Sequence, residues 1–282
     1  MISAENLFYT YELANNTKIN AVENVSFNLE KGKALGIVGK TGSGKSTLVS
    51  MLNGLLVPTK GKVFLNSKDI NKDFKNKQEV KFKIGLVFQY PENQLFESSV
   101  YDDIAFGLRN KGLDDYKIKL EIEEVSETLQ ISKKVINSSP FSLSGGEKRK
   151  CALAGTLVLK PEVLILDEPT SALDFNVKMN LLNCLKNYCK KEKNSVVFIS
   201  HVMEEVVEIA DDILVMKDGK SAYYGKTTDL FNEYENIEIK VPQILEIMSI
   251  INSKGYNVSK NIFSLSEAKE ELLKLLKRGG NI

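Results

Sequence analysis

The sequence predicts an α/β fold in which a mainly parallel β-sheet is flanked by helices. Two observations carry this prediction. Short continuous apolar runs, typical of strands buried on both faces, recur at residues 33–39, 84–89, 162–168 and 195–200. They alternate with longer stretches whose apolar residues have helical spacing, at residues 46–56, 145–159 and 175–192. This alternation is typical of parallel strands joined by crossover helices.

The first predicted strand, "KALGIVG", leads into a glycine-rich turn and then a helix, "STLVSMLNGLL", that ends near Pro58. The strand "IGLVFQ" follows at 84–89. From there to residue 160 the pattern is helical only: 115–136 is charged with apolar residues at helical spacing, and a helix at 145–159 opens with Ser144 and two glycines. We therefore expect a helical subdomain, at about 90–160, inserted into the α/β domain.

The strand–helix alternation resumes with "EVLILDE", a continuous apolar strand that ends in two carboxylates. A helix at about 175–192, the strand "SVVFIS", a short helix at 202–210 and the strand "DILVMKDG" follow. Beyond about residue 235 the pattern changes to two amphipathic helices, "VPQILEIMSIINSKGY" and "SLSEAKEELLKLLKRG". The prediction is thus a main domain at 1–235 and a small C-terminal helical appendage at 236–282.

Composition narrows the function classes. Hydrophobic residues make up 43% and charged residues 27%, with a net charge of +1 and scattered basic residues, so nucleic acid is not favoured as a partner. The three cysteines form no CxxC pair and there is one histidine, which argues against a zinc site and favours a reducing cytosol. We expect neither a signal peptide nor a membrane span, so action at a membrane would need a partner.

The turn after the first strand carries the first chemical motif. Residues 39–46 match G-x-x-x-x-G-K-[ST] between a strand and a helix, which is the context of a phosphate-binding loop (P-loop). Glycines let backbone N–H groups surround an anion, and the following helix directs its positive end toward it. Lys45 would contact the β- and γ-phosphates, the Ser46 hydroxyl would ligate Mg²⁺ and Thr47 would bond phosphate oxygens. We expect the phosphate loop to comprise Gly39, Lys40, Thr41, Gly42, Ser43, Gly44, Lys45, Ser46 and Thr47.

Two carboxylates end the strand "LILDE". Asp167 is predicted to hold Mg²⁺, through water, and Glu168 to orient the water that attacks the γ-phosphate. Two acids that merely solvate a strand end would look the same in isolation, but the P-loop earlier in the chain favours the catalytic interpretation. The predicted fold is accordingly a P-loop NTPase.

The segment "LSGGEKRK" decides the family. With "GKTGSGKST", "FQ", "LILDEPTSALD" and "ISH" in this order, residues 1–230 resemble the ATPase subunits of ABC transporters. In this family the turn formed by Ser144, Gly145 and Gly146 caps a helix that meets the γ-phosphate bound by the other subunit. The residue that is most often Gln in the family is Glu147 here. The resemblance implies ATP as the substrate, Mg²⁺ as the metal and a dimer of ATPase subunits.

Other positions take their roles from the same resemblance. Gln89 matches the Q-loop glutamine that approaches Mg²⁺ and the attacking water, and Asp174 matches the D-loop aspartate at the dimer interface. Tyr11 resembles the aromatic residue that stacks on adenine, with Phe8 and Tyr9 as rivals. His201 would by itself be read as a polar residue at a strand end. Its place after "SVVFIS", a strand expected beside "LILDE", makes it match the histidine that contacts the γ-phosphate and supports Glu168.

The stretch "VFQYPENQLFESSVYDDIAFGLRN" narrows the resemblance to the energy-coupling factor (ECF) ATPases of cobalt-type and vitamin-type importers. That resemblance implies an integral membrane scaffold with coupling helices, a substrate-capture membrane protein, and a peripheral position on the cytoplasmic face of the membrane. The coupling helices would enter a groove near residues 89–110, although about half of its apolar residues could instead fill the subdomain core (Tyr90, Leu95, Phe96, Val100, Tyr101 and Phe106).

Alternatives are an ATPase of another ABC importer class and a soluble ABC ATPase acting on nucleic acid. The single set of motifs, the near-neutral charge and the lack of a long heptad region disfavour the second. A regulatory nucleotide binder without turnover is disfavoured by the complete set of Lys45, Asp167, Glu168 and His201. The sequence leaves open whether the ATPase pair is a homodimer or a heterodimer.

Overall fold

The computed structural model describes residues 1–279 except 13, 15, 234–238, 260–261 and 264. Its central element is a six-stranded sheet in the order β10-β9-β3-β8-β7-β6, in which all neighbours are parallel except the β9–β10 pair. Its strands are β3 (Ala34–Val38), β6 (Ile84–Val87), β7 (Val163–Asp167), β8 (Ser195–Ile199), β9 (Asp212–Lys217) and β10 (Lys220–Lys226). The predicted α/β class with a mainly parallel sheet is confirmed.

A second sheet, in the order β2-β1-β4-β5, is antiparallel and was not expected from the sequence. Its strands are β1 (Ile2–Glu12), β2 (Lys18–Leu29), β4 (Lys60–Leu65) and β5 (Lys68–Asp69). The β1–β2 register shifts between Ala4 and Leu7, and Asn6 and Asn24 have positive φ angles of 46° and 55°. Such bulges interrupt the alternation of apolar and polar residues by which strands are recognised.

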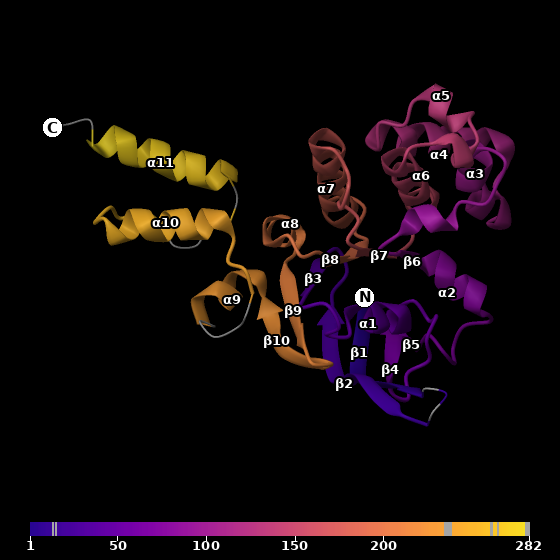
Figure 1. Cartoon of the computed structure of the whole chain (residues 1–282), viewed down its shortest axis with the longest axis horizontal. Helices are drawn as coiled ribbons and strands as arrows, with labels where there is room; N and C mark the ends of the chain where they lie inside the picture. The colour runs from indigo at the N-terminus through magenta and orange to yellow at the C-terminus, as the bar shows by residue number, and fades with distance from the viewer. Residues whose placement is uncertain (13, 15, 234–238, 260–261, 264, 280–282) are drawn as a thin grey trace.

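Helices cover the central sheet on both sides (Figure 1). The helix α1 and the second sheet share one core with one face of β3, β7 and β8, and α7 and α8 pack on the other face. The described helices are α1 (Lys45–Leu52), α2 (Lys77–Lys83), α3 (Val100–Asn110), α4 (Asp115–Thr128), α5 (Lys133–Ile136), α6 (Gly145–Leu157), α7 (Phe175–Lys190), α8 (Met203–Ile209), α9 (Thr227–Glu233), α10 (Gln243–Ser253) and α11 (Leu265–Gly279), with short 3₁₀ turns at Pro91–Gln94 and Pro140–Ser142.

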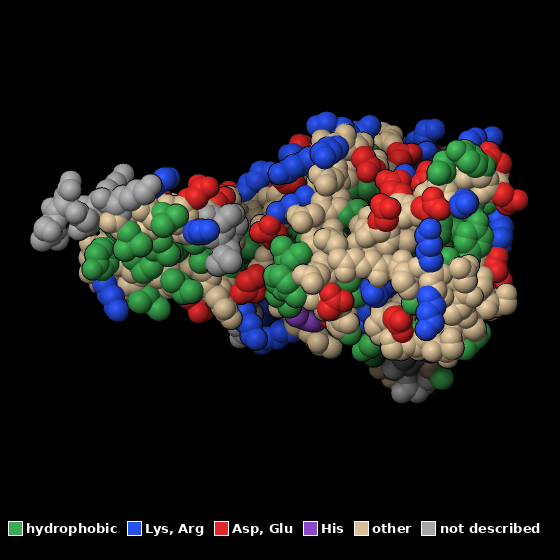
Figure 2. All heavy atoms as spheres, turned by 90° about the horizontal axis from the view of Figure 1, so that it is seen from above, with side chains coloured by type: hydrophobic (Ala, Val, Ile, Leu, Met, Phe, Trp, Pro, Cys, Tyr) green, Lys and Arg blue, Asp and Glu red, His purple; other side chains and the backbone are tan. Residues whose placement is uncertain are grey.

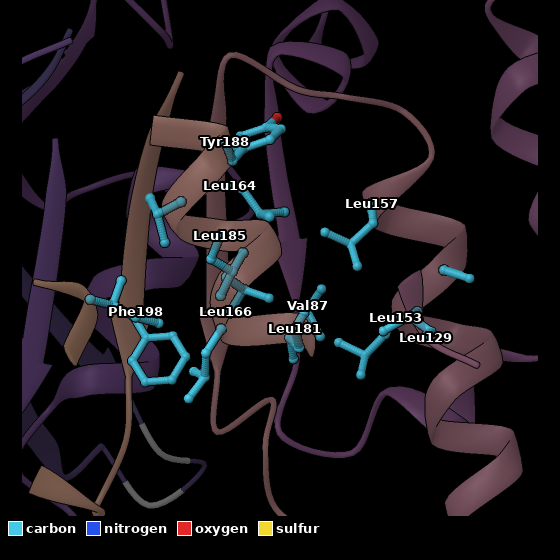
Figure 3. Packing of buried hydrophobic residues seen from close by; sticks show 14 of the residues in the cluster. Val87, Leu129, Leu153, Leu157, Leu164, Leu166, Leu181, Leu185, Tyr188 and Phe198 are labelled. Carbon is cyan, nitrogen blue, oxygen red and sulfur yellow. The ribbon is translucent and has the colours of Figure 1, made fainter. Parts of the chain in front are cut away.

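The helices α3 to α6 lie between β6 and β7 in the chain and gather at the upper right in Figure 1, as the helical pattern of this stretch predicted. The region expected to be helical at 115–136 is divided into α4 and α5, because the chain turns at Gln130, whose φ is 52°. Figure 3 shows Leu153 and Leu157 of α6 directed toward β7 and α7, where Leu166 and Leu181 belong to the same buried cluster. This packing joins the helical region to the sheet.

The C-terminal helices α10 and α11 lie together at the far left of Figure 1 around a small core of Met248, Val258, Ile262 and Ala268. Hydrophobic side chains also gather on their surface in Figure 2, whereas basic and acidic side chains are interspersed over the rest of that face. The boundary expected between residues 235 and 236 lies outside the described residues. Within the described residues, no helix combines the length and apolar character needed to cross a bilayer.

Candidate functional site

The backbone of the phosphate loop requires glycine at two positions. Gly39 and Gly44, with φ angles of 150° and 96°, lie between β3 and α1. A Cβ atom at Gly39 would come within 2.2 Å of the Met216 carbonyl oxygen, and one at Gly44 within 2.3 Å of the Ala21 carbonyl oxygen. Because backbone oxygens cannot move aside as a flexible side chain could, any larger residue would open the loop.

The loop surrounds the ammonium group of Lys45, whose residue is only 7% exposed. Its Nζ donates to the carbonyl oxygens of Gly39 at 2.7 Å and Lys40 at 2.9 Å. Burial lowers the pKa of Lys45, against the opposing effect of the carboxylates of Asp167 and Glu168. An anion in the loop would favour the charged ammonium further, so the loop is built to receive a negative ligand.

One further feature of the loop favours an anion with several oxygen atoms. None of the described side chains caps the first turn of α1, so its backbone N–H groups are available at the loop. The buried Ser43 hydroxyl has no hydrogen-bond partner among the described residues, but Ser43 does not line the cavity that Lys45 and Ser46 face.

The two carboxylates predicted at the end of "LILDE" lie at the same edge of the sheet. Asp167 is the last residue of β7, and its Oδ2 accepts a hydrogen bond of 3.0 Å from the Ser46 hydroxyl. Burial raises the pKa of Asp167, and the hydrogen bond from Ser46 partly offsets this effect. Glu168 follows with a φ of 50°, a left-handed conformation that turns its side chain away from the strand direction.

His201 meets Glu168 across adjacent strands. Because β8 pairs with β7 in parallel, both strands end at this edge, as the sequence predicted. The His201 Nε2 and Glu168 Oε1 atoms are 2.6 Å apart, a hydrogen-bond distance, while the side chains are 48% and 19% exposed. A cavity of about 200 Å³ is lined by most of the predicted residues: Thr41, Gly42, Gly44, Lys45, Ser46, Thr47, Gln89, Asp167, Glu168 and His201.

The three aromatic rivals at the N-terminal strand are separated by their positions. The Tyr11 hydroxyl lies 3.3 Å from the Thr47 hydroxyl, so this ring stands beside the phosphate loop. Tyr9 packs edge-on against Tyr11 with ring centroids 4.9 Å apart, and Phe8 instead lies under the Lys60 ammonium. Of the three, Tyr11 is the one whose side chain contacts a loop residue directly.

The predicted turn of Ser144, Gly145 and Gly146 does not join this cavity. Ser144 caps α6 in a reciprocal arrangement, in which its hydroxyl accepts from the Glu147 N–H and the Glu147 carboxylate accepts from the Ser144 N–H. Within the described residues, no atom lies within 4 Å of the position of a Cβ on Gly145. Asp174 is likewise remote from the cavity lining, exposed, and bonded to the Val177 N–H as the cap of α7.

Of the six apolar residues expected near the partner groove, half are exposed and half pack into the core. Tyr90, Phe96 and Phe106 are 59%, 59% and 45% exposed, and the two phenylalanine rings meet edge to face at 5.1 Å. The other three residues pack into the core: Leu95, Val100 and Tyr101. The exposed phenylalanines line a surface cavity together with residues of α2, α3 and α6.

Of the buried charged residues that the sequence analysis did not single out, two contact Glu168 or residues beside the Glu168–His201 pair. Arg149, in "LSGGEKRK", is 4% exposed and donates to the backbone oxygens of Gln89 and Glu168. Glu205, also 4% exposed, accepts from the hydroxyls of Thr170 and Ser200, which flank the Glu168–His201 pair in sequence. Arg149 precedes Leu153 and Leu157 at four-residue spacing, so a charge on the apolar face of a helix was the available signal.

The fold and this site together define a P-loop α/β protein in which the carboxylates of Asp167 and Glu168 lie beside the phosphate loop. Residues 22–171 match the family model described as ABC transporter. The chain is 40% identical, over 100% of its length and 99% of the relative's, to the energy-coupling factor transporter ATP-binding protein EcfA2 of Caldanaerobacter subterraneus subsp. tengcongensis. The chain therefore belongs to the ABC transporter family, in the group of ECF transporter ATP-binding proteins, and is a nucleotide-binding protein.

Solved structures agree with this assignment. The cbiO1 protein of Clostridium perfringens, described as part of the ABC transporter complex cbiONQ, is 31% identical with a TM-score of 0.72, over 90% of this chain and 96% of that one. A dimeric ATP-binding cassette in a post-hydrolysis state, bound to ADP and Pi, is 26% identical with a TM-score of 0.73, over 80% of this chain and 98% of that one. The predicted family and fold are confirmed.

Proposed function

We propose that the chain is the ATP-binding and ATP-hydrolysing subunit of an ECF transporter, which drives uptake of vitamins or transition-metal ions through membrane partners. The full-length similarity to an ECF transporter ATP-binding protein supports the transport role. The observation that carries the hydrolytic role is the Glu168–His201 pair at the rim of the cavity that also holds Lys45 and Asp167. On this proposal the protein works at the cytoplasmic face of the cell membrane as a peripheral subunit.

The loop would hold the ATP phosphates through its backbone N–H groups and the Lys45 ammonium, with the Thr47 hydroxyl as a further donor. Tyr11, which stands over Thr47, would stack on the adenine ring. The loop's requirement for small residues at Gly39 and Gly44 keeps the backbone close enough to the phosphates for these contacts.

The residues present fit Mg²⁺. The Ser46 hydroxyl and the Asp167 carboxylate, already 3.0 Å apart, are the hard oxygen donors that Mg²⁺ prefers, and Gln89 supplies an amide at the same cavity. Within the described residues, no cluster of three or more His, Cys, Asp or Glu side chains could hold a metal. Mg²⁺ is instead bound by few protein groups plus nucleotide phosphates, and when bound it neutralises charge on those phosphates.

Glu168 is the group proposed to act on water. Its carboxylate would accept a hydrogen bond from the water that attacks the γ-phosphorus, so that a new P–O bond forms as the bond to ADP breaks. The Glu168–His201 hydrogen bond fixes the imidazole next to this carboxylate, where it would contact the γ-phosphate. Gln89, on the neighbouring strand end, would help to orient the same water.

The turn of Ser144, Gly145 and Gly146 would complete the site of a second ATPase subunit. Gly145 has open space around it and the turn starts a helix of 13 residues, so its N–H groups suit a γ-phosphate presented by a partner. Asp174 would lie at the same interface. Two ATP molecules bound in this way would hold the two subunits together until hydrolysis releases them.

The exposed Phe96–Phe106 pair would receive a coupling helix of the membrane scaffold. An edge-to-face aromatic pair in a surface cavity offers the apolar anchor that an amphipathic helix needs. The cavity lies beside the segment that carries Gln89, so motion at the nucleotide could reach the scaffold. The substrate-capture protein would then meet the scaffold rather than this chain.

The test is the Glu168→Gln variant in a phosphate-release assay with Mg²⁺. We expect it to bind ATP and dimerise while losing turnover by at least about 100-fold, because amide replaces the base. Glu127→Gln, on the exposed face of α4, is the matched control and should hydrolyse ATP at the parental rate. Parental turnover in Glu168→Gln would exclude Glu168 as the catalytic carboxylate. Co-purification of the chain with membrane proteins from detergent extracts tests the transport role.

A further inference from the structure

One buried cation in the helical region reaches the catalytic edge of the sheet. Arg149, in the second turn of α6, is 4% exposed, and its NH2 group donates to the Gln89 carbonyl oxygen at 2.7 Å and the Glu168 carbonyl oxygen at 3.0 Å. Its NH1 atom lies 3.8 Å from the Glu92 carboxylate, which supplies a compensating charge. An arginine keeps its charge in proteins, so the burial of this guanidinium depends on the hydrogen-bond acceptors and the carboxylate around it.

These contacts join two segments that come from neighbouring strands. The strands β6 and β7 pair in parallel, Gln89 follows β6 by two residues, and Glu168 follows β7 directly. Each segment leaves the sheet at the cavity edge, and both Gln89 and Glu168 line the cavity there. The guanidinium bridges them through one NH2 group, whose two N–H bonds have directions fixed by the planar group.

The hydrogen bond from Arg149 helps to hold Glu168 in an uncommon backbone conformation. Its φ of 50° is a conformation that non-glycine residues adopt only when the surroundings hold them there. The Glu168 N–H donates to the Ile199 carbonyl oxygen at 2.9 Å, and the Glu168 carbonyl oxygen accepts from Arg149 at 3.0 Å and from the Ser171 N–H at 3.3 Å. The N–H is therefore held from β8 and the carbonyl oxygen from α6 and from the following turn, and the side chain is directed toward His201.

We infer that Arg149 is a positioning residue, which fixes Glu168 and Gln89 relative to each other and ties both to the helix that begins at Ser144. A shift of the Gln89 segment would then move the catalytic carboxylate through one side chain. This inference rests on the proposed hydrolysis of ATP for its kinetic consequences, but the link itself has a structural signature that does not depend on turnover.

The experiment compares Arg149→Met and Arg149→Lys with Lys160→Gln. Lys160 also lies in the helical region and pairs with Glu121 and Glu124 of α4, so its loss removes an ion pair without contact to the catalytic edge. Two quantities are measured for each protein: amide hydrogen exchange without nucleotide in the peptides covering 87–92 and 167–170, and kcat and KM for ATP in the purified ATPase assembly.

We expect Arg149→Met to speed exchange in both peptides together, and to lower kcat by about 30- to 100-fold with KM changed less than about threefold, because a small misplacement of a catalytic group is costly and the phosphate loop is untouched. Arg149→Lys should fall between Met and the parent, since an ammonium can replace one of the two hydrogen bonds. Lys160→Gln should match the parent in both peptides and in kcat.

Unchanged exchange in both peptides, or parental kcat in folded Arg149→Met, would overturn the inference. So would a rise in KM with kcat intact, which would make Arg149 part of nucleotide binding. If Arg149→Met does not fold, the smaller change in Arg149→Lys decides by the same criteria. If the parent itself hydrolyses no ATP, the proposed function fails, and the exchange measurement still decides whether Arg149 links the two segments.

Discussion

The two regions proposed to contact phosphate, the loop at residues 39–47 and the turn at residues 144–146, differ in how many polar and charged side chains surround them. Around the loop at residues 39–47, one chain brings together a cation, a hydroxyl–carboxylate pair and the Glu168–His201 pair in a single cavity. The turn at residues 144–146 has the same kind of helix N-terminus, but it lies outside that cavity, with open space at Gly145 and the Ala172 carbonyl oxygen 3.8 Å from a Cβ position at Gly146. Both regions present a helix N-terminus that suits an anion. The proposed catalytic residues of this chain lie around the first region, the loop.

On the proposed function, the loop would bind the phosphates within one chain, and the turn would contact the nucleotide of a second subunit. Satisfied local geometry, as in the Ser144–Glu147 cap, keeps the turn folded without a ligand, and the hydrogen bonds from Ser144 lower the pKa of Glu147. The loop region instead holds the buried Lys45 ammonium on its own carbonyl oxygens, where a bound phosphate would add a negative charge beside it. We therefore expect changes at the loop to act within one chain and changes at the turn to act between chains.

Among three substitutions around the loop, the largest effect is expected from His201→Ala, which tests the proposed catalytic groups there. Loss of the hydrogen bond to Glu168 should lower ATP turnover by about 100-fold while the Kd for ATP changes less than about threefold. Phosphate release and calorimetric titration measure the two quantities. Unchanged turnover would return His201 to a structural role at the end of β8.

A smaller effect is expected from Tyr11→Ala, which tests whether Tyr11 stacks on the adenine ring of ATP. Removing a stacked ring should weaken ATP binding by roughly fivefold, whereas Tyr11→Phe should bind almost as the parent does. Phe8→Ala is the matched control, because Phe8 lies by Lys60 rather than by the loop. The assignment of Tyr11 is wrong if Phe8→Ala weakens binding and Tyr11→Ala does not.

The smallest effect concerns stability at Asp167. Burial raises the pKa of Asp167 in the folded chain above its unfolded value, so the folded state disfavours the carboxylate. The resulting penalty is absent below the unfolded pKa of about 3.9 and is complete once the pH exceeds the folded pKa. Without nucleotide and Mg²⁺, Asp167→Asn should therefore raise the Tm at pH 7 by about 2 °C.

Thermal denaturation from pH 3 to pH 8 measures this difference, which should vanish below about pH 4. The exposed Glu123→Gln change in the middle of α4 is the control and should leave the Tm unaltered. A lower Tm for Asp167→Asn at pH 7 would mean that the Ser46 hydrogen bond outweighs burial. Mg²⁺ should stabilise the ATP-bound parent and not this variant.

The sequence was sufficient to place site residues that belong to a motif at the end of a predicted strand. Gly39 to Thr47, Asp167, Glu168 and His201 could be placed at one edge because parallel strands share the direction in which they end. The second sheet was missed because its first strands are bulged at Asn6 and Asn24. Arg149 and Glu205 were missed because their partners are backbone oxygens and hydroxyls from distant segments, which no local pattern reveals.

The most direct test of this division is the Ser144→Arg variant, which fills the open turn with a large cation. ATP affinity is measured in the isolated chain and turnover in the assembled ATPase pair. We expect parental affinity in the isolated chain and a loss of turnover of at least about 100-fold in the pair, because on the proposed function the turn would contact the nucleotide of the other subunit. Parental turnover in the pair, or an equal loss of affinity in the isolated chain, would contradict the account.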